Sequence, residues 1–560
     1  MSLRGASAGN TLILVDGIPV NDPSVITNYF DLNLLTPDQV DHIEVMKGGQ
    51  STLYGSDAVA GVINIILKKN RQPGFSGDLA LNAGSYGTLE QSAGIRAANK
   101  QIGFSLAYRH NQSRGFSSAY DPSKSGSFDR DGFNQHGVDG KLDLRLHPRL
   151  LLQLSGQYAY YRAELDAAAY TDEKDYAVRN RNLRVAAGLS WEHGHGTLRA
   201  NYHYNRVNRH YVDDSVFRGS PYLDYSDTRF TGRTHFAEVY NQWKGKNWEW
   251  IAGMDLRSHF TDQYALFIFP GFPTPPSTLK ARMSQWSPYS SLLLRAGRGW
   301  AFEFGGRWNH HSEYGNNFSF TLNPSWQAGR RVKLFGNLYS AYKVPTLYQL
   351  FDPSAGNKNL KPEEGVVAEL GTVLTPAAAQ RIRLTGFYRK TRHAILYSFD
   401  PSTYQSLYVN AASQQNYGLE AEADYRFGKW SLRVNYTYTD GATRSAYDGT
   451  GAPLGKDTSY FNLYRIPRHA GNLALSWSPV KTIWLETRLR LVSKRQEFIY
   501  GASPEVQGGY GVVDLYGEYR FGRPLVVFLN LRNLTNTRYF DIPGYTSRNF
   551  NLLAGISVKF

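Results

Sequence analysis

The long C-terminal part of the chain, from about residue 71 to Phe560, alternates apolar and polar residues in one short segment after another. The alternation is clearest in residues 141–146, 431–438, 483–491 and 551–560. A period of two residues is typical of a β-strand with one apolar face and one polar face. No helical segment follows that could cover these strands, so their apolar faces need another cover.

Lipid is the simplest cover for so many one-sided strands. The chain has no run of about 18 apolar residues that could form a transmembrane helix, whereas a membrane strand needs only every second residue apolar. In lipid every backbone group must be paired, so the sheet must close on itself. The sequence therefore predicts an all-β transmembrane barrel of about 22 antiparallel strands. The predicted strands span residues 75–84, 87–98, 101–111, 134–147, 150–161, 180–192, 195–208, 230–243, 247–260, 282–296, 299–309, 316–327, 331–342, 365–375, 380–392, 416–427, 430–440, 467–477, 481–494, 510–521, 525–533 and 549–560.

The connections between these strands are alternately short and long. Short turns such as residues 147–149 and 244–247 contain Gly, Pro, Lys or Arg. The long connections span residues 112–133, 162–179, 209–229, 261–281, 343–364, 393–415, 441–466, 495–509 and 534–548. Short turns on one side and long loops on the other are typical of bacterial outer-membrane barrels. We therefore predict a multi-pass barrel in the bacterial outer membrane, in contact with outer-membrane lipid.

The N-terminal part of the chain has a different character. Short strands and tight turns in residues 10–69 indicate a small α/β unit. A barrel this wide leaves a lumen that must be plugged. The sequence therefore predicts a partial plug domain in residues 1–70 and the barrel in residues 71–560.

Composition narrows the classes of function. The chain has no cysteine, which removes disulfides, thiol catalysis and thiolate metal sites. Its formal net charge is +15, but Lys and Arg form no basic run, so no nucleic-acid partner is predicted. No catalytic set with recognisable spacing is present, so the protein is not expected to be an enzyme. A passive porin-like channel is the alternative of a different class, and the plug argues against it.

Several short motifs follow one another along the chain. They are Val15-Asp16-Gly17-Ile18-Pro19, Ile43-Glu44-Val45, Tyr54-Gly55-Ser56-Asp57, Tyr342-Lys343-Val344-Pro345-Thr346-Leu347, Asn416-Tyr417-Gly418-Leu419-Glu420 and Arg532-Asn533-Leu534. In this order the motifs resemble the TonB-dependent outer-membrane receptors, most of all their vitamin B12 (cobalamin) branch. Lys47-Gly48-Gly49 departs from the Arg-Gly-Pro usual in that family.

The resemblance implies a receptor that binds and imports a scarce nutrient, with no cofactor required. Cobalamin or a related corrinoid is the first expectation, and a ferric siderophore or haem is the alternative. The implied partners are the TonB–ExbB–ExbD energy complex and the barrel-assembly machinery, for which Phe560 would be the assembly signal. The segment that couples to TonB and the first plug strands are expected upstream of this sequence. A surface lipoprotein that caps the loops and an N-terminal signalling domain stay open.

The best candidate for a ligand-binding plug tip is the segment from Pro19 to Tyr29. It offers amide and carboxylate groups on a backbone stiffened by proline, and in the resembled receptors this segment touches ligand. The candidate residues are Pro19, Val20, Asn21, Asp22, Pro23, Ser24, Asn28 and Tyr29. An ordinary polar turn is the alternative interpretation.

Tyrosines are the second candidate contact surface, because each offers flat contact area with one polar group. Those in or near the long loops are Tyr120, Tyr161, Tyr170, Tyr176, Tyr222, Tyr225, Tyr397, Tyr404 and Tyr408.

One loop also carries a candidate metal site. Asp129 and Asp131 are two residues apart and precede Gly132-Phe133, so their oxygens can be presented to a hard cation. The resembled cobalamin receptors use a similar motif for calcium that orders the loops. The next long loop adds Asp172 and Asp175, together with Asp166, as further candidate ligands. An ordinary Asp-Gly hairpin turn is the alternative.

Overall fold

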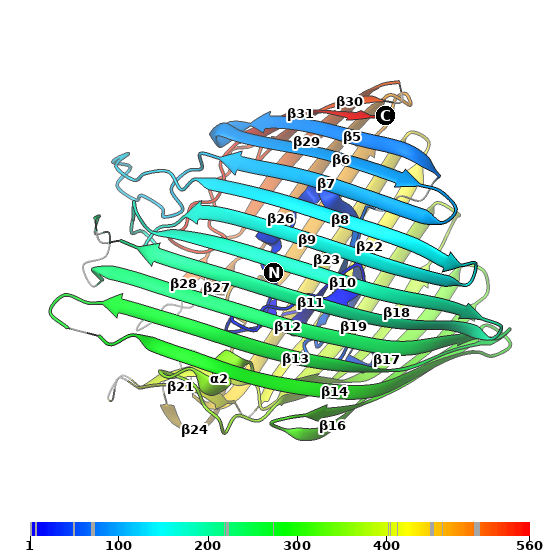
Figure 1. Cartoon of the computed structure of the whole chain (residues 1–560), viewed down its shortest axis with the longest axis horizontal. Coiled ribbons are helices and arrows are strands. Elements are labelled where there is room, and N and C mark those ends of the chain that lie inside the picture. The colour runs from blue at the N-terminus through cyan, green and yellow to red at the C-terminus, as the bar shows by residue number, and fades with distance from the viewer. Residues whose placement is uncertain are drawn as a thin grey trace.

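The barrel wall is one closed antiparallel sheet whose strands follow one another in chain order (Figure 1). The computed structural model describes residues 3–5, 8–48, 51–68, 73–214, 216–217, 219, 223–272, 274–400, 403, 405–411, 413–447, 453–461, 463–497, 505–522 and 524–560. The wall strands are β5 (Gly74–Gly84), β6 (Thr88–Ala98), β7 (Ile102–Ser113), β8 (Phe133–His147), β9 (Leu150–Glu164), β10 (Ala177–His193), β11 (Gly196–Asp213), β12 (Tyr225–Lys244), β13 (Trp248–Ile268), β14 (Ser277–Arg295), β15 (Trp300–His311), β16 (Gly315–Ala328), β17 (Val332–Lys343), β18 (Glu363–Leu374), β19 (Gln380–Arg392), β22 (Ser413–Phe427), β23 (Trp430–Tyr447), β25 (His469–Trp477), β26 (Ile483–Val492), β29 (Tyr510–Phe521), β30 (Leu525–Arg532) and β31 (Asn551–Lys559). The last strand pairs with the first, so the predicted barrel of 22 strands is confirmed.

Several short elements lie in connections that were expected to be plain loops. β24 (Pro453–Tyr460) pairs with β23 beyond the part of β23 that pairs with β25. Two small hairpins are formed by β20 (Ile395–Asp400) with β21 (Gln405–Asn410), and by β27 (Arg495–Glu497) with β28 (Glu505–Gln507). Helix α2 (Leu347–Phe351) follows β17, and the 3-10 turn η4 (Ser85–Gly87) joins β5 to β6.

The exposure of side chains is the reverse of that in a soluble domain. Leu370 and Leu419 are 75% and 61% exposed, whereas Arg307 and Asp255 are fully buried. Apolar residues therefore cover the outside of the wall, where lipid solvates them, and charged residues line the inside. In the described residues, no helix has the length and apolar character needed to cross a membrane.

Indole rings collect at the end of the barrel that carries the short turns. Trp243 stacks on Trp250 with ring centroids 4.5 Å apart, and Trp430 stacks on Trp477 at 5.3 Å. Such aromatic pairs mark the level where lipid tails meet headgroups. This rim is therefore a membrane boundary.

Several strands are longer than predicted. β12 and β13 contain 20 and 21 residues, whereas a strand needs about 9–11 to cross a bilayer. The predicted loops 209–229 and 261–281 are correspondingly too long. The predicted strands end where the apolar alternation ends. Above the lipid both faces of each strand meet polar surroundings, so backbone pairing continues there without alternation in the sequence.

The N-terminal residues form the predicted plug around a four-stranded sheet in the order β2-β1-β4-β3. Its elements are η1 (Ala8–Asn10), β1 (Thr11–Val15), β2 (Ile18–Pro19), η2 (Leu32–Leu34), η3 (Pro37–Gln39), β3 (Val40–Lys47), α1 (Ser51–Tyr54) and β4 (Gly61–Leu67). β1 and β4 are parallel, and the other two pairs are antiparallel. β4 ends at Leu67 and the barrel begins at Gly74, so the proposed boundary after residue 70 falls in residues 69–72, outside the described part of the chain.

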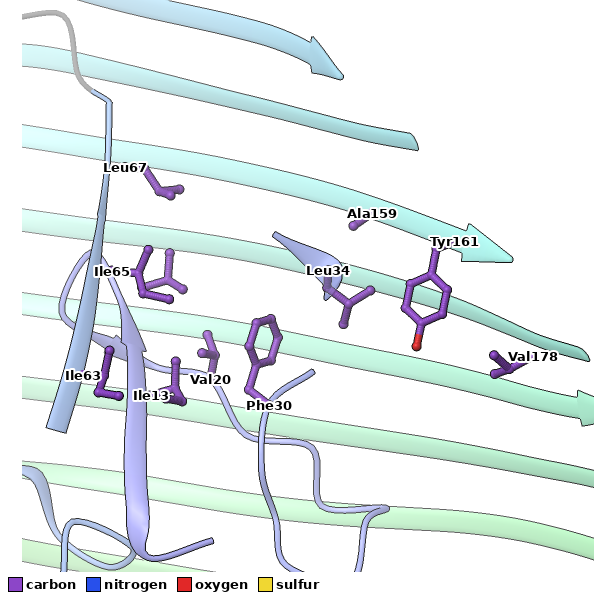
Figure 2. Packing of buried hydrophobic residues seen from close by; sticks show 11 residues of the cluster. Ile13, Val20, Phe30, Leu34, Ile63, Ile65, Leu67, Ala159, Tyr161 and Val178 are labelled. Atoms are coloured by element: carbon purple, nitrogen blue, oxygen red, sulfur yellow. The ribbon is translucent and has the colours of Figure 1, made fainter. Parts of the chain in front are cut away.

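An apolar cluster joins one face of the plug to the wall (Figure 2). Phe30, Leu34 and Ile65 of the plug lie in one buried group with Tyr161 and Val178 of the barrel. The cluster spans two domains, so the plug is packed against this side of the lumen and does not float in it.

Phe560, the proposed assembly signal, lies at the seam of the barrel. Its backbone exchanges hydrogen bonds with Gly77, at 2.8 and 3.0 Å, and its ring lies 6.4 Å from that of Phe75. The ring is 60% exposed at the outside of the wall. Its part in assembly stays a prediction.

Candidate functional site

The segment from Pro19 to Tyr29 forms the tip loop of the plug, and both of its ends are fixed to Asp57. The side-chain amides of Asn21 and Asn28 each donate to Asp57 Oδ2 at 3.1 Å. Asp57 is buried and has a φ of 73°, in the left-handed region that favours a turn. The motif that contains Asp57 therefore fixes the conformation of the tip loop.

The barrel wall holds the tip loop from one side. Asn205 donates to the backbone oxygen of Asn21 at 2.9 Å, and Arg209 donates to the oxygen of Ser24 at 3.2 Å. The guanidinium of Arg209 also lies 3.3 Å from the Asp22 carboxylate. β11 thus supplies partners for the backbone oxygens of Asn21 and Ser24 and for the Asp22 carboxylate.

A second barrel segment, residues 343–346, contacts both the tip loop and η1 of the plug. Lys343 Nζ donates to Asn10 Oδ1 at 2.9 Å, and the Thr346 hydroxyl donates to the backbone oxygen of Ile26 at 2.8 Å. The same hydroxyl accepts from Gln349 N in a capping box that begins α2. This barrel motif therefore connects the plug tip to an external loop.

Most of the predicted ligand-binding residues are used in these contacts. Pro19, Val20, Asn21, Asp22, Pro23, Ser24 and Asn28 are buried, while Tyr29 is 45% exposed. Ile26, which sequence reasoning did not select, is also 45% exposed. The open surface of the tip is therefore formed by an aromatic and an aliphatic side chain, which suits a flat, partly apolar ligand. An apolar residue inside a polar turn was the signal that could have identified Ile26.

The tyrosines of the external loops mainly contact other loops. The backbone amides of Tyr120 and Tyr170 both donate to the oxygen of Gly544, at 2.8 and 3.1 Å, which joins three long connections. The Tyr120 ring packs edge-on against Phe540 at 4.9 Å. Tyr161 and Tyr408 are buried, and Tyr222 and Tyr404 lie outside the described residues.

Two groups of carboxylates lie in the external loops near β8–β11. The first contains Asp129, Asp131 and Asp166, and the second contains Glu173, Asp175 and Asp213. In each group one oxygen per residue lies within 4.8 Å of the others. The predicted metal ligands are therefore divided between two groups. Asp172 accepts from the Asp129 amide at 3.1 Å, at the edge of the first group.

The first group lacks enough partners for its charge. Asp129 and Asp131 each have a buried Oδ1 without a hydrogen-bond partner. Burial raises the pKa of Asp131 to about 7, and the nearby Asp166 carboxylate acts in the same direction. Burial also raises the pKa of Asp129, and Asp172 adds to that shift.

The second group shows the same imbalance. Burial raises the pKa of Glu173 to about 7, with the Asp213 carboxylate acting in the same direction. Asp175 has a raised pKa as well, mainly from burial, and its Oδ1 is buried without a hydrogen-bond partner. Several carboxylates with raised pKa values and unpaired buried oxygens form a donor set that suits a hard divalent cation.

Ion pairs hold the plug on the side away from the apolar cluster. Arg4 lies between two barrel carboxylates, with Nη1 on Glu369 and Nη2 on Glu420 at 2.8 Å. Lys47 pairs with Glu422 and lies 3.4 Å from Glu420. These contacts span two domains, so they must break before the plug moves.

Comparisons with known proteins agree with this architecture. The model of the family "TonB dependent receptor-like, beta-barrel" matches residues 165–534, and the model "TonB-dependent Receptor Plug Domain" matches residues 1–62. The vitamin B12 transporter BtuB of Vibrio cholerae serotype O1 is 24% identical over 583 residues, covering 100% of this chain and 85% of the relative.

Solved structures share the fold at low identity. The ferric enterobactin receptor PfeA of Pseudomonas aeruginosa, in a mutant bound to enterobactin, has a TM-score of 0.78 and 20% identity, covering 100% of this chain and 92% of the other. The copper transporter OprC has a TM-score of 0.82 and 16% identity, covering 100% and 91%. The family consists of receptors and transporters, which are not enzymes. The chain belongs to the TonB-dependent receptors, the outer-membrane barrels that import nutrients with TonB as a partner.

Proposed function

We propose that this receptor binds and imports cobalamin or a closely related corrinoid. The observation that carries the proposal is the likeness to a vitamin B12 transporter across the whole chain, plug and barrel included. The open tip surface of Ile26 and Tyr29 supports it, because a corrin ring is broad, flat and partly apolar.

Calcium is the proposed structural ion of the external loops. Asp129, Asp131 and Asp166 come from two different connections, so a cation bound among them would fix one loop against the next. Glu173, Asp175 and Asp213 would do the same for the connection that follows. Calcium accepts such irregular oxygen sets more readily than magnesium, which requires near-octahedral geometry.

Transport in this proposal requires the plug to shift within the barrel, with energy supplied by TonB–ExbB–ExbD. The two sides of the plug differ in what they release. Opening the side of the apolar cluster would break the Asp16–Lys141 and Asp22–Arg209 pairs and would also expose the apolar surface around Phe30 and Leu34 to water. Opening the opposite, ionic side would break the pairs of Arg4 and Lys47, whose charges water can solvate. We place the first opening on the ionic side, because water solvates the separated charges there, whereas exposing the apolar cluster to water is not compensated.

A ferric siderophore is the second candidate, favoured by a cavity in the lumen. A cavity of about 500 Å³ lies between β23 and β31, and five arginines line it against two acids. The lining arginines are Arg433, Arg488, Arg490, Arg532 and Arg548. Such a surface suits an anionic ferric chelate. The enterobactin-bound structure of PfeA is of that ligand class.

Equilibrium binding to the purified receptor in detergent tests the proposal. Cyanocobalamin, a ferric catecholate siderophore and haem are compared, each with calcium and with a calcium chelator. We expect cyanocobalamin to bind most tightly and chelation to weaken it by about tenfold or more. The matched variants are Asp131→Asn, within the first carboxylate group, and Asp121→Asn, a partly exposed aspartate of the same loop that accepts hydrogen bonds from Ser123 and Ser125.

The outcomes separate the two parts of the proposal. Tight binding of the ferric chelate alone would remove the cobalamin assignment. Tight cyanocobalamin binding that is unchanged by chelation and equal in both variants would support cobalamin as the substrate and contradict the proposed calcium site.

A further inference from the structure

Arginines gather on the outer face of neighbouring wall strands. We call this set the outer arginine patch: Arg179 and Arg181 of β10, Arg206 of β11, Arg233 of β12 and Arg282 of β14. Their immediate neighbours in sequence on β10 and β11, including Asn180, Asn182 and Asn205, are buried inside the barrel. Because successive strand residues face opposite sides, the arginines face outward. β9–β14 lie side by side on the near wall in Figure 1.

The patch lies where the apolar outer face ends. On the same outward rows, toward the short turns, Leu183, Val239 and Leu256 are 40–48% exposed. The Tyr202 hydroxyl bonds the imidazole of His235 at 2.8 Å just below the patch. Above it, β11 ends at Asp213, in the second carboxylate group. The arginines are therefore at the outer boundary of the lipid, at headgroup level.

Like charges in the patch face one another across the strands. Arg206 is the direct cross-strand partner of Arg233. Phe260 stands opposite Arg233 on one side and opposite Arg282 on the other, so three arginines share one row. Facing like charges destabilise a sheet unless something compensates them.

In the described part of the chain, aromatic rings supply some of this compensation, because the Arg233 guanidinium lies 5.0 Å from the centre of the Phe260 ring and that of Arg181 lies 5.9 Å from the centre of the Tyr160 ring. None of the five arginines takes part in an ion pair there, and Arg233 Nε is buried without a hydrogen-bond partner. Arg206 Nε is held by Asn208 at 3.3 Å, and Arg282 Nε by Ser258 at 3.2 Å. These single contacts orient the guanidinium groups and leave their terminal nitrogens available.

We propose that the outer arginine patch binds the phosphate groups of an anionic lipid of the outer leaflet. Guanidinium forks match phosphate oxygens, and several forks in one row can hold two phosphates of one headgroup. Charge complementarity and the position at the lipid boundary identify a membrane lipid as the occupant. The opposite wall differs, because Arg392 of β19 stands across from Glu364 of β18 and Lys390 across from Val366.

The test measures lipid binding to the receptor in detergent by native mass spectrometry. The probes are diphosphorylated lipid A, its dephosphorylated form and inorganic phosphate. The variant Arg206→Gln/Arg233→Gln/Arg282→Gln is compared with Lys390→Gln/Arg392→Gln, which removes outward charge from the opposite wall. Retained heat-modifiable migration on gels shows that each variant is folded, and Arg206→Gln alone replaces the triple variant if that one does not fold.

We expect the wild type and the Lys390/Arg392 variant to bind diphosphorylated lipid A at least about tenfold more tightly than the triple variant, or about threefold more tightly than Arg206→Gln. Dephosphorylation should reduce binding to the wild type by a similar factor. Equal binding of the lipid by the patch variant and the wild type would overturn the proposal, as would equal binding of both lipid forms. Inorganic phosphate that binds as tightly as the lipid would overturn the lipid as occupant.

Discussion

The acidic residues of the lumen and those of the external loops differ in what neutralises them. In the lumen, Asp255 lies between Arg257 and Arg307 at 2.8 and 2.6 Å, and all three side chains are buried. In the loops, Asp131 and Asp166 are surrounded by other carboxylates. The same residue type is thus paired by arginine inside the barrel and left with unpaired buried oxygens outside it.

This difference indicates two separate roles for charge. The lumen carboxylates Asp255, Glu369 and Glu420 already have arginine partners, so they need no ligand for neutralisation, and the last two connect the plug to the wall. The loop groups would become neutral only by protonation or by binding a cation. The external loops are therefore the part of the receptor whose order should depend on conditions.

The largest effect is expected from Asp255→Asn, which leaves two buried guanidinium groups without a carboxylate. Removing one member of a buried ion pair costs about 3–5 kcal/mol, and we expect the free energy of unfolding in detergent to fall by that amount. Denaturant unfolding followed by tryptophan fluorescence measures it. Asp262→Asn on the same strand, whose partner Lys280 is 3.8 Å away and exposed, is the control and should change stability by less than about 1 kcal/mol.

Glu420→Gln should have the next largest effect, on the plug alone. The substitution weakens the Arg4 and Lys47 contacts, each a charge-assisted bond contributing about 1.5–3 kcal/mol, while Glu369 still pairs with Arg4. Hydrogen exchange of residues 40–47 should become about tenfold faster, with β11 and β12 unchanged. Unaltered exchange in β3 would mean that the ionic side does not hold the plug.

A smaller, pH-dependent effect is expected in the loops. The folded-state pKa of Asp131 is about 7, above its ordinary value of 3.8, so the folded loops bind more protons than unfolded ones between these values. The calcium-free loop arrangement should therefore lose stability as pH rises from about 4 to 7 and be least stable above pH 7. Limited proteolysis should cleave residues 114–132 faster at pH 8 than at pH 6, and calcium should remove most of that difference. Equal cleavage at both pH values would contradict the prediction.

The smallest effect is expected at the open surface of the plug tip. Tyr29→Ala removes an exposed ring that contacts ligand in our proposal, and we expect cyanocobalamin to bind about three- to tenfold more weakly, with stability unchanged. Tyr388→Ala, which removes a similarly exposed tyrosine from the outer face of β19, should leave binding the same. Equal affinity of both variants would place the ligand elsewhere.

The barrel was predictable because two local signals agree along the wall. Alternation of apolar residues and short turns such as residues 147–149 predicted β8 and β9 almost to their ends. The upper ends of β12 and β13 were missed because polar residues on both faces carry no alternation. The hairpin of β20 and β21 was missed because it is formed within a loop.

The sites were only partly predictable, for a different reason. Asp129 and Asp131 are close in sequence, so their spacing indicated a cation site. Asp213 joins Glu173 and Asp175 only because β11 returns to the same rim of the barrel. The pair of Arg4 with Glu369 joins residues 365 positions apart, and no local pattern indicates it. Likewise, the polar composition of the tip loop predicted exposed residues, but contacts with Arg209 and Asn205 bury most of them.

Calcium titration of the chelator-treated receptor by calorimetry tests the central distinction most directly. The account predicts about two calcium ions per chain for the wild type and for Asp121→Asn, and loss of one of them in Asp131→Asn/Asp166→Asn. Binding of no calcium by the wild type, or equal binding by the double variant, would contradict it. The unpaired loop carboxylates would then need neutralisation by protons alone.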